Sequence, residues 1–208
     1  MDLAGGPGPT LTARGTVTRQ RLIDAAREEL IDTGGVLDVA GVVRRAEVSP
    51  GLLYRYFGSK DGLVAAVVNA FYDDYDAAVF AVVLDPDAGW SARERRRLER
   101  EITFLCDDPL ARVIVGRRLR EGAAAQVDAE RLAGQIRLAA RNVAHGQRAG
   151  EIDPGVDANL VAAAFLGAFR ELMGEALRRD RAPSRRALLD ILVRLGDSII
   201  PARVELAR

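Results

Sequence analysis

Four side chains close together in the sequence, Tyr54, Arg55, Tyr56 and Lys60, combine aromatic hydroxyl groups with positive charge. A guanidinium group can donate two hydrogen bonds to the edge of a guanine, whereas lysine and tyrosine side chains bind backbone phosphates. These residue types at this spacing indicate contact with double-stranded DNA. A structural role for the tyrosines is the alternative, but it does not explain why exposed aromatic rings stand beside an arginine.

Two short helices must position these side chains. Val39, Val42, Val43 and Ala46 are spaced three and four residues apart and form the apolar face of the first helix. Asp38 precedes that face, where its carboxylate is expected to accept hydrogen bonds from the free amide groups of the first turn.

The second helix is expected to begin after Ser49, a capping residue, with Pro50 in its first turn, where a missing N–H costs nothing. Leu53 and Phe57 lie four residues apart and face inward. Gly58-Ser59 ends this helix and begins the next one, at Lys60. The pattern predicts a helix-turn-helix, a motif that places its second helix in the major groove of DNA.

The stretch AEVS, followed by LLYRYF and GSKDGL, resembles the N-terminal domain of the TetR/AcrR family of transcriptional regulators over Thr18–Ala77. The resemblance implies that Tyr54, Tyr56 and Lys60 bind phosphates, while Arg55 is the candidate for reading bases. The full set of predicted DNA-binding residues is Ser49, Pro50, Gly51, Leu52, Tyr54, Arg55, Tyr56 and Lys60.

The sequence departs from the family pattern in the motif itself. Glu47 stands where glycine is usual, at a position where a left-handed backbone is expected, and Leu52 replaces a common threonine. Ala40 and Gly41 are too short to reach far. These departures put the operator sequence beyond prediction. They also motivate an alternative, a helical small-molecule sensor or interaction protein whose degenerate helix-turn-helix lacks specific DNA binding.

Composition limits the other classes of protein. The 208 residues are 49% hydrophobic and 29% charged with zero formal net charge, so DNA contact has to come from local charge placement. The single cysteine, Cys106, excludes an internal disulfide. No run approaches the roughly 20 apolar residues of a membrane span, and no signal core is present. A cytoplasmic protein without membrane contact is expected.

The periodicity predicts an all-α fold. Residues 1–15 are expected to form a disordered tail, although Arg14 could reach a minor groove. Residues 16–62 form the helix-turn-helix domain and residues 63–208 a helical ligand-binding and dimerisation domain, with one long helix, 59–83, shared between them. Further helices are expected at Thr18–Thr33, from a capping box at Ser91–Glu94 to about Cys106, from Asp108-Pro109 to near Gly122, and at about Ala124–Ala149, Asp157–Arg179 and Ser184–Ile200.

The resemblance implies two functions for the second domain. Its helices would hold a small apolar or amphipathic ligand, and the last two long helices would pair with those of a second subunit. Each of these side chains could instead be ordinary core. The candidate ligand-binding residues are Phe71, Tyr75, Trp90, Phe104, Phe165, Phe169 and Met173, and the candidate dimer-interface residues are Ala164, Gly167, Ala168, Leu188, Leu192, Leu195 and Ile199.

Catalytic chemistry has little support. His145 is the only histidine and lies on a polar helix end, while Cys106 sits in an apolar stretch as a small core residue. Phosphate-loop, zinc and dinucleotide motifs are absent from the sequence. An arginine cluster, Arg93, Arg95, Arg96, Arg97 and Arg100, is interpreted as a solvated helix face. We therefore expect that the protein is not an enzyme and that it binds neither a cofactor nor a metal ion.

The function that follows is a dimeric transcriptional regulator, a repressor released from a palindromic operator by a small molecule. Its expected partners are operator DNA, the small-molecule effector and a second copy of the chain.

Overall fold

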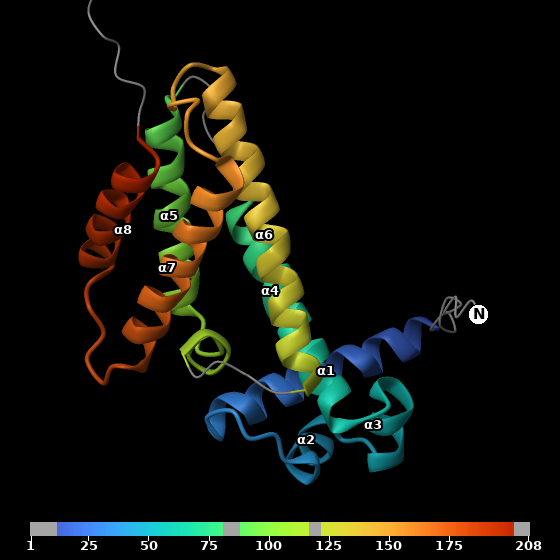
Figure 1. The fold of residues 1–208 in the computed structure, drawn as a ribbon. Coiled ribbons are helices and arrows are strands. Elements are labelled where there is room, and N and C mark those ends of the chain that lie inside the picture. The colour runs from blue at the N-terminus through green and yellow to red at the C-terminus, as the bar shows by residue number, and fades with distance from the viewer. Residues whose placement is uncertain (1–11, 81–87, 117–121, 202–208) are drawn as a thin grey trace, which may run out of the picture.

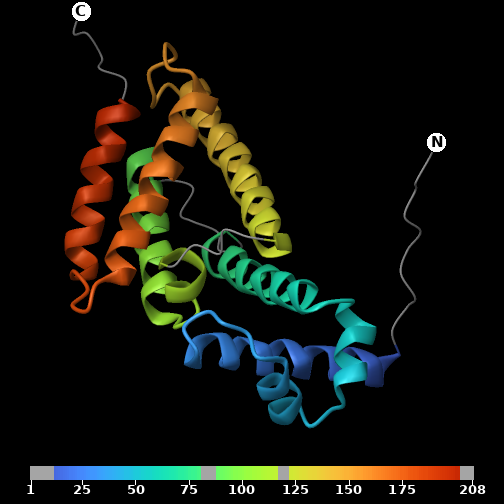
Figure 2. The ribbon, with the colours of Figure 1, turned by 60° about the horizontal axis from the view of Figure 1, so that its bottom comes forward.

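Helices alone make up the regular structure of the described residues, 12–80, 88–116 and 122–201 of the computed structural model. Helices α1 to α3 lie together at one end of the molecule, α4 leads away from them, and α5 to α8 form the remainder (Figures 1 and 2). The all-α class is confirmed. The helices are α1 (Ala13–Asp32), α2 (Val39–Ala46), α3 (Pro50–Phe57), α4 (Lys60–Val79), α5 (Trp90–Asp107), α6 (Gly122–Arg148), α7 (Ala158–Arg178) and α8 (Arg185–Ile199), and the π-helical turn η1 spans Arg112–Gly116.

Helix α1 is longer than its apolar stripe suggests. It begins at Ala13, inside the predicted tail 1–15 and five residues before Thr18, because the hydroxyl of Thr12 accepts a hydrogen bond from the amide of Gly15 and caps the first turn. The remainder of the predicted tail, residues 1–11, lies outside the described residues. Helix α1 ends at Asp32, ahead of the Gly34-Gly35 stop.

The helix-turn-helix has the predicted caps at its first helix. Asp38 accepts hydrogen bonds from the amides of Ala40 and Gly41 at 3.2 and 3.0 Å, which fixes the start of α2. Val42 and Leu53 are fully buried, so α2 and α3 share the core that α1 provides. Glu47 ends α2 in the left-handed region with φ of 53°, as expected from its place in the turn.

Replacing Glu47 with glycine is expected to stabilise the protein by about 1 kcal/mol, because glycine adopts positive φ without steric cost. Alanine at the same position keeps the strain and loses the exposed 3.6 Å ion pair to Arg21, so it serves as the control. Urea unfolding of both variants at equal protein concentration measures the difference. A glycine variant no more stable than the alanine variant would contradict the strain argument.

Two predicted capping interactions are wrong. Ser49 occupies the N-cap of α3 but its hydroxyl makes no capping hydrogen bond, and Pro50 alone defines the first turn. Helix α5 begins at Trp90 after Gly89, so Ser91 and Glu94 do not form a capping box. Glu94 instead accepts a hydrogen bond from Asn142, and Glu151 accepts the hydrogen bond of the Trp90 amide.

Helix α4 ends earlier than predicted. Its last residue is Val79, and the amide of Phe80 donates the final hydrogen bond to the carbonyl of Asp76. The predicted end at Val83 lies outside the described residues. The helix predicted from Asp108-Pro109 to near Gly122 is replaced by η1, and residues 117–121 are outside the described part. The Asp108 carboxylate accepts from the amide of Leu110 and so holds the chain in a turn.

The later helix boundaries agree with the sequence. Asp157 accepts from the amides of Asn159 and Leu160 at the start of α7, and Ser184 accepts from the amide of Ala187 at the start of α8. One continuous apolar core connects α1 through to α8, and it includes Phe71, Met173 and Leu192 as fully buried side chains. Of the helices described, none is both long enough and apolar enough to cross a bilayer.

Candidate nucleic-acid interface and ligand cavity

The outer face of α3 carries the polar and basic side chains that the sequence singled out. Tyr54 is 47% exposed and Arg55 is exposed beside it. Tyr56 differs from its expected outward position, because it is half-buried and packs against the core. The other predicted contact residues lie at the start of this helix, where Ser49, Pro50 and Gly51 are exposed and Leu52 is half-buried.

Lys60 is the first residue of α4 and is exposed. The hydroxyl of Ser59 accepts a hydrogen bond from the amide of Gly62 at 2.9 Å and fixes this helix start. Free amides and the helix dipole favour a phosphate group at such a terminus, where the lysine adds a full positive charge. Tyr54, Arg55 and Lys60 are thus held on two consecutive helices whose junction is rigidly capped.

The two arginines that end α2 have different environments, which sequence reasoning did not separate. Arg45 binds Glu29 at 2.9 Å and Asp32 at 2.6 Å, and this pairing ties α2 to α1. Arg44 is exposed on the same turn and is available to a phosphate. The signal was present, since Glu29 and Asp32 lie one turn apart on α1 and can meet one arginine from α2.

A partly enclosed cavity of about 290 Å³ lies among α4, α5, α6 and α7. Two of the predicted ligand-binding residues line it, Tyr75 and Phe165. Trp90 and Phe165 line a narrower cavity of about 70 Å³ beside α8. Phe71, Phe169 and Met173 are at most 4% exposed and line none of these hollows, so the structure places them in the core.

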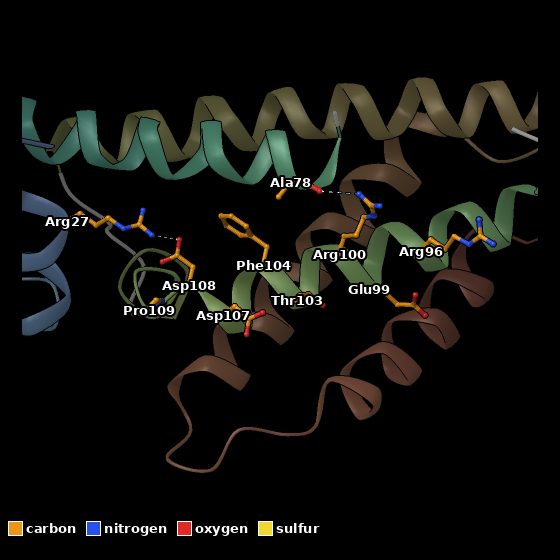
Figure 3. Close-up of a pocket in the computed structure, with 10 residues that line it drawn as sticks. All are labelled: Arg27, Ala78, Arg96, Glu99, Arg100, Thr103, Phe104, Asp107, Asp108 and Pro109. Carbon is orange, nitrogen blue, oxygen red and sulfur yellow. Dashed lines mark hydrogen bonds and ion pairs between the residues drawn. The ribbon is translucent and has the colours of Figure 1, made fainter. Parts of the chain in front are cut away.

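Phe104 faces a third hollow, an open groove of about 900 Å³ between α4 and α5 (Figure 3). Its charged side chains bind other protein groups. Arg27 of α1 binds Asp108 at 2.6 Å, and Arg100 donates to the carbonyl of Ala78 at 3.5 Å (Figure 3). The groove therefore contains a polar link between the helix-turn-helix end and the end of α5.

The cavity of about 290 Å³ also holds a buried carboxyl group that sequence reasoning missed. Glu101 of α5 is 4% exposed, and the hydroxyl of Tyr75 donates a hydrogen bond to it. Burial, followed by the nearby Glu94 carboxylate, raises the pKa of Glu101 to about 8. The sequence position of Glu101 could have indicated its burial, because Glu101 falls on the same face of α5 as the apolar residues Leu98 and Leu105.

The predicted solvated arginine face of α5 is wrong in part. Arg97 lines the cavity, donates to Glu94, and lies 5.9 Å from the centre of the Phe80 ring. Arg93 is largely buried against Glu151, with 16% of its side chain exposed. Arg95 and Arg96 are exposed as predicted, and Arg100 is half-buried.

The surface of α7 and α8 offers only some of the residues predicted for a dimer interface. Ala164 and Gly167 are exposed, and Ala168, Leu195 and Ile199 are partly exposed. Leu188 and Leu192 are 3% and 0% exposed because they fill the core between α8 and its neighbours, so the structure removes them from the surface set. Two further apolar residues of these helices are exposed, Leu160 at 70% and Ile191 at 43%.

The side chains considered for catalysis remain isolated. His145 is exposed at the end of α6, and burial raises the pKa of the half-buried Cys106 thiol. Within the described residues, no three histidine, cysteine or acidic side chains gather closely enough to hold a metal ion.

Comparisons with known proteins agree with the fold and with the helix-turn-helix. Residues 22–67 match the family described as "Bacterial regulatory proteins, tetR family". A curated relative, HTH-type transcriptional regulator BetI of Paraburkholderia phytofirmans, is 31% identical over 121 residues, which is 58% of this chain; BetI of Paraburkholderia xenovorans matches equally. The chain spans about half, 49%, of the length of these relatives.

Solved structures share the whole architecture. A putative TetR-family transcriptional regulator from Rhodococcus sp. superposes with a TM-score of 0.73 at 23% identity, over 88% of this chain and 98% of that one. AibR, in complex with isovaleryl coenzyme A and operator DNA, superposes with a TM-score of 0.65 at 19% identity, over 89% and 99%. Residues 22–67 therefore form a DNA-binding domain of the tetR type, and the chain as a whole has the fold of TetR-like regulators.

Proposed function

We propose that this protein is a dimeric, ligand-responsive transcriptional regulator that binds a palindromic operator and is released from it by a small molecule. The observation that carries the proposal is the exposed set of Tyr54, Arg55 and Lys60 on α3 and the start of α4. The assignment of residues 16–62 to DNA binding and 63–208 to ligand binding and dimerisation belongs to the proposal. So do a non-enzymatic role and a cytoplasmic location, where the operator is accessible.

Helix α4 connects the two proposed functions directly. Lys60 lies at its first residue, and Tyr75, four turns along, lines the cavity. A second connection is the ion pair of Arg27 with Asp108, which joins α1 to the end of α5. A ligand that favours one position of α4 would move the reading helix and change the fit of a dimer to successive grooves.

The size of such a response is set by how differently the ligand binds the two arrangements, typically about 1–3 kcal/mol of coupling. AibR supports the plausibility of this arrangement, since its crystal structure contains both a ligand and operator DNA on the same fold. At 19% identity that likeness concerns the fold alone, so the class of ligand has to be inferred from the residues that line the cavity of this protein.

A second candidate is a small-molecule sensor that has lost specific DNA binding. Ala40, which is exposed at the start of α2 and too short to reach DNA, favours it, as does Leu52 in place of a hydroxyl-bearing residue. Mobility shift of DNA flanking the protein's own gene separates the two candidates. If the protein–DNA complex persists when non-specific competitor DNA is added, the result supports the regulator. If the competitor abolishes the complex, the result supports the sensor.

The proposed phosphate contact makes a sharper test. Lys60→Ala is expected to weaken binding to all DNA sequences alike and to lower the slope of log affinity against log salt concentration by about 1. Arg55→Ala is the matched variant, and it should reduce discrimination at one base pair of each half-site by roughly 1–3 kcal/mol. Titrations at several salt concentrations measure both effects, and an unchanged slope for Lys60→Ala would remove Lys60 from the interface.

A further inference from the structure

The ionisable side chains of the cavity among α4, α5, α6 and α7 are unevenly paired. Arg97 donates to Glu94, so these two charges neutralise each other, and Asn142 donates to the same Glu94 carboxylate at 2.8 Å. Glu101 has the Tyr75 hydroxyl as its hydrogen-bond partner and no cation of its own within the described lining. The pair Glu94–Arg97 therefore leaves Glu101 as the carboxyl group of the described lining with which a cationic ligand can pair.

The remaining lining suits an apolar body of limited size. Tyr75, Phe80 and Phe165 contribute aromatic rings, and Leu98, Leu138 and Leu166 contribute aliphatic surface. Aromatic faces attract cations through the negative potential above the ring. An anionic ligand gains no such partner, because its carboxylate would lie near Glu94 and would oppose the ionisation of Glu101 in a partly dry site.

One polar atom of the lining lacks a partner. The Nε–H of Arg97 is buried without a hydrogen-bond acceptor in the protein. Unpaired buried donors are unfavourable, and 23% of the Arg97 side chain is exposed, so the guanidinium group can donate a hydrogen bond to an oxygen atom of a bound molecule. An uncharged oxygen meets this need without adding a negative charge beside Glu94.

Resting on the proposed ligand-responsive function, we infer that this cavity takes a protonated amine with a compact apolar or aromatic body and a neutral oxygen acceptor. The ammonium group donates to Glu101, the ring packs among Tyr75, Phe80 and Phe165, and the oxygen accepts from Arg97. This assigns to Glu101 the specificity for positive charge.

Burial gives the inference a pH signature. The pKa of Glu101 is raised to about 8, so the carboxyl group is protonated in the empty cavity at neutral pH and must lose its proton to pair with an ammonium group. Amine affinity should rise about fivefold from pH 7 to pH 8, with release of nearly one proton at pH 7. The titratable groups around Glu101 are Tyr75 and Asp76 from α4 and Glu94 and Arg97 from α5, while α6 and α7 contribute Gln135, Asn142, Phe165 and Leu166, which do not titrate.

Three probes with one skeleton test the inference by calorimetry on the full-length protein. They are 2-amino-1-phenylethanol, its neutral counterpart 1-phenylethane-1,2-diol, and mandelate. The amine is expected to bind at least about tenfold more tightly than the diol, with no binding of mandelate. Glu101→Gln should abolish the preference for the amine and its pH dependence, and Glu99→Gln, an exposed residue on the same helix, should retain both.

Contrary outcomes are equally clear. Diol or mandelate binding as tightly as the amine, failure of all three to bind, or an unchanged preference in Glu101→Gln would overturn the ligand class. Mobility shift on the same preparation keeps the two proposals apart. If the wild type retards operator DNA yet shows no amine preference, the ligand class is wrong while the regulator remains.

Discussion

Replacing Ile191 with glutamate is expected to give a folded monomer that binds a palindromic operator about 10²–10⁴-fold more weakly than the wild type. Ile191 is 43% exposed on α8, which lies beside α7 at the edge of the molecule (Figures 1 and 2). Helix α7 exposes Ala164 and Gly167, two small residues that allow another helix to approach closely. A glutamate at the centre of such a contact would be buried without a partner in the dimer.

The loss of DNA affinity follows from geometry. Two reading helices on two subunits bind half-sites about one DNA turn apart, so a monomer loses the gain from binding both at once. Light scattering measures the mass, and mobility shift measures the affinity. Val36→Glu is the control, because Val36 is 67% exposed in the connection between α1 and α2, and it should leave the mass unchanged.

Leu192, next in sequence, provides the opposite case. It is fully buried within one protomer, so Leu192→Glu places a carboxylate in the core and is expected to cost roughly 4 kcal/mol or more, which prevents folding instead of dissociating a dimer. Circular dichroism distinguishes a folded monomer from an unfolded chain. A dimeric Ile191→Glu protein that still binds operator tightly would refute the proposed interface.

The contrast between Ile191 and Leu192 shows where sequence reasoning stops. Apolar spacing and capping residues such as Asp38, Asp157 and Ser184 predict most helices, because these signals act within one or two turns. They leave undetermined which side of an apolar helix is covered by the same chain. Leu188 and Leu192 looked like interface residues and are core, since α8 packs its richest apolar face inward.

Long-range contacts explain the other differences. Glu94 fits a capping box by spacing, yet it is bound by Asn142, 48 residues later, and by Arg97. The first amide of α5, that of Trp90, therefore donates its hydrogen bond to Glu151, which is also distant in sequence. The cavity shows the same effect. Glu101 lines it, whereas Phe71, Phe169 and Met173, which residue type alone favours as ligand contacts, lie in the core.

The protein's own stability should report on Glu101 without any ligand. The pKa of this group is about 8 when folded, against 4.5 for an unperturbed glutamate, because the carboxyl group is buried beside Glu94. Its contribution to stability is fully present below pH 4.5 and is lost as pH rises through about 8, since the folded state binds the proton more tightly than the unfolded state does. The loss amounts to at most about 1.4 kcal/mol per pH unit, several kcal/mol in total.

Glu101→Gln is accordingly expected to gain stability over the wild type as pH rises from about 5 to about 8, with a constant difference above that range. Glutamine keeps the size of the side chain and cannot ionise, whereas Asp76, whose pKa burial also raises, is present in both proteins and cancels in the difference. Urea unfolding across this pH range, at one protein concentration, measures the effect, because dimerisation makes stability depend on concentration. Glu99→Gln, whose side chain is 48% exposed on the same helix, should track the wild type throughout. Parallel curves for Glu101→Gln and the wild type would mean that Glu101 ionises freely in the folded protein, and the cavity would then lack the protonated carboxyl group on which its pH signature depends.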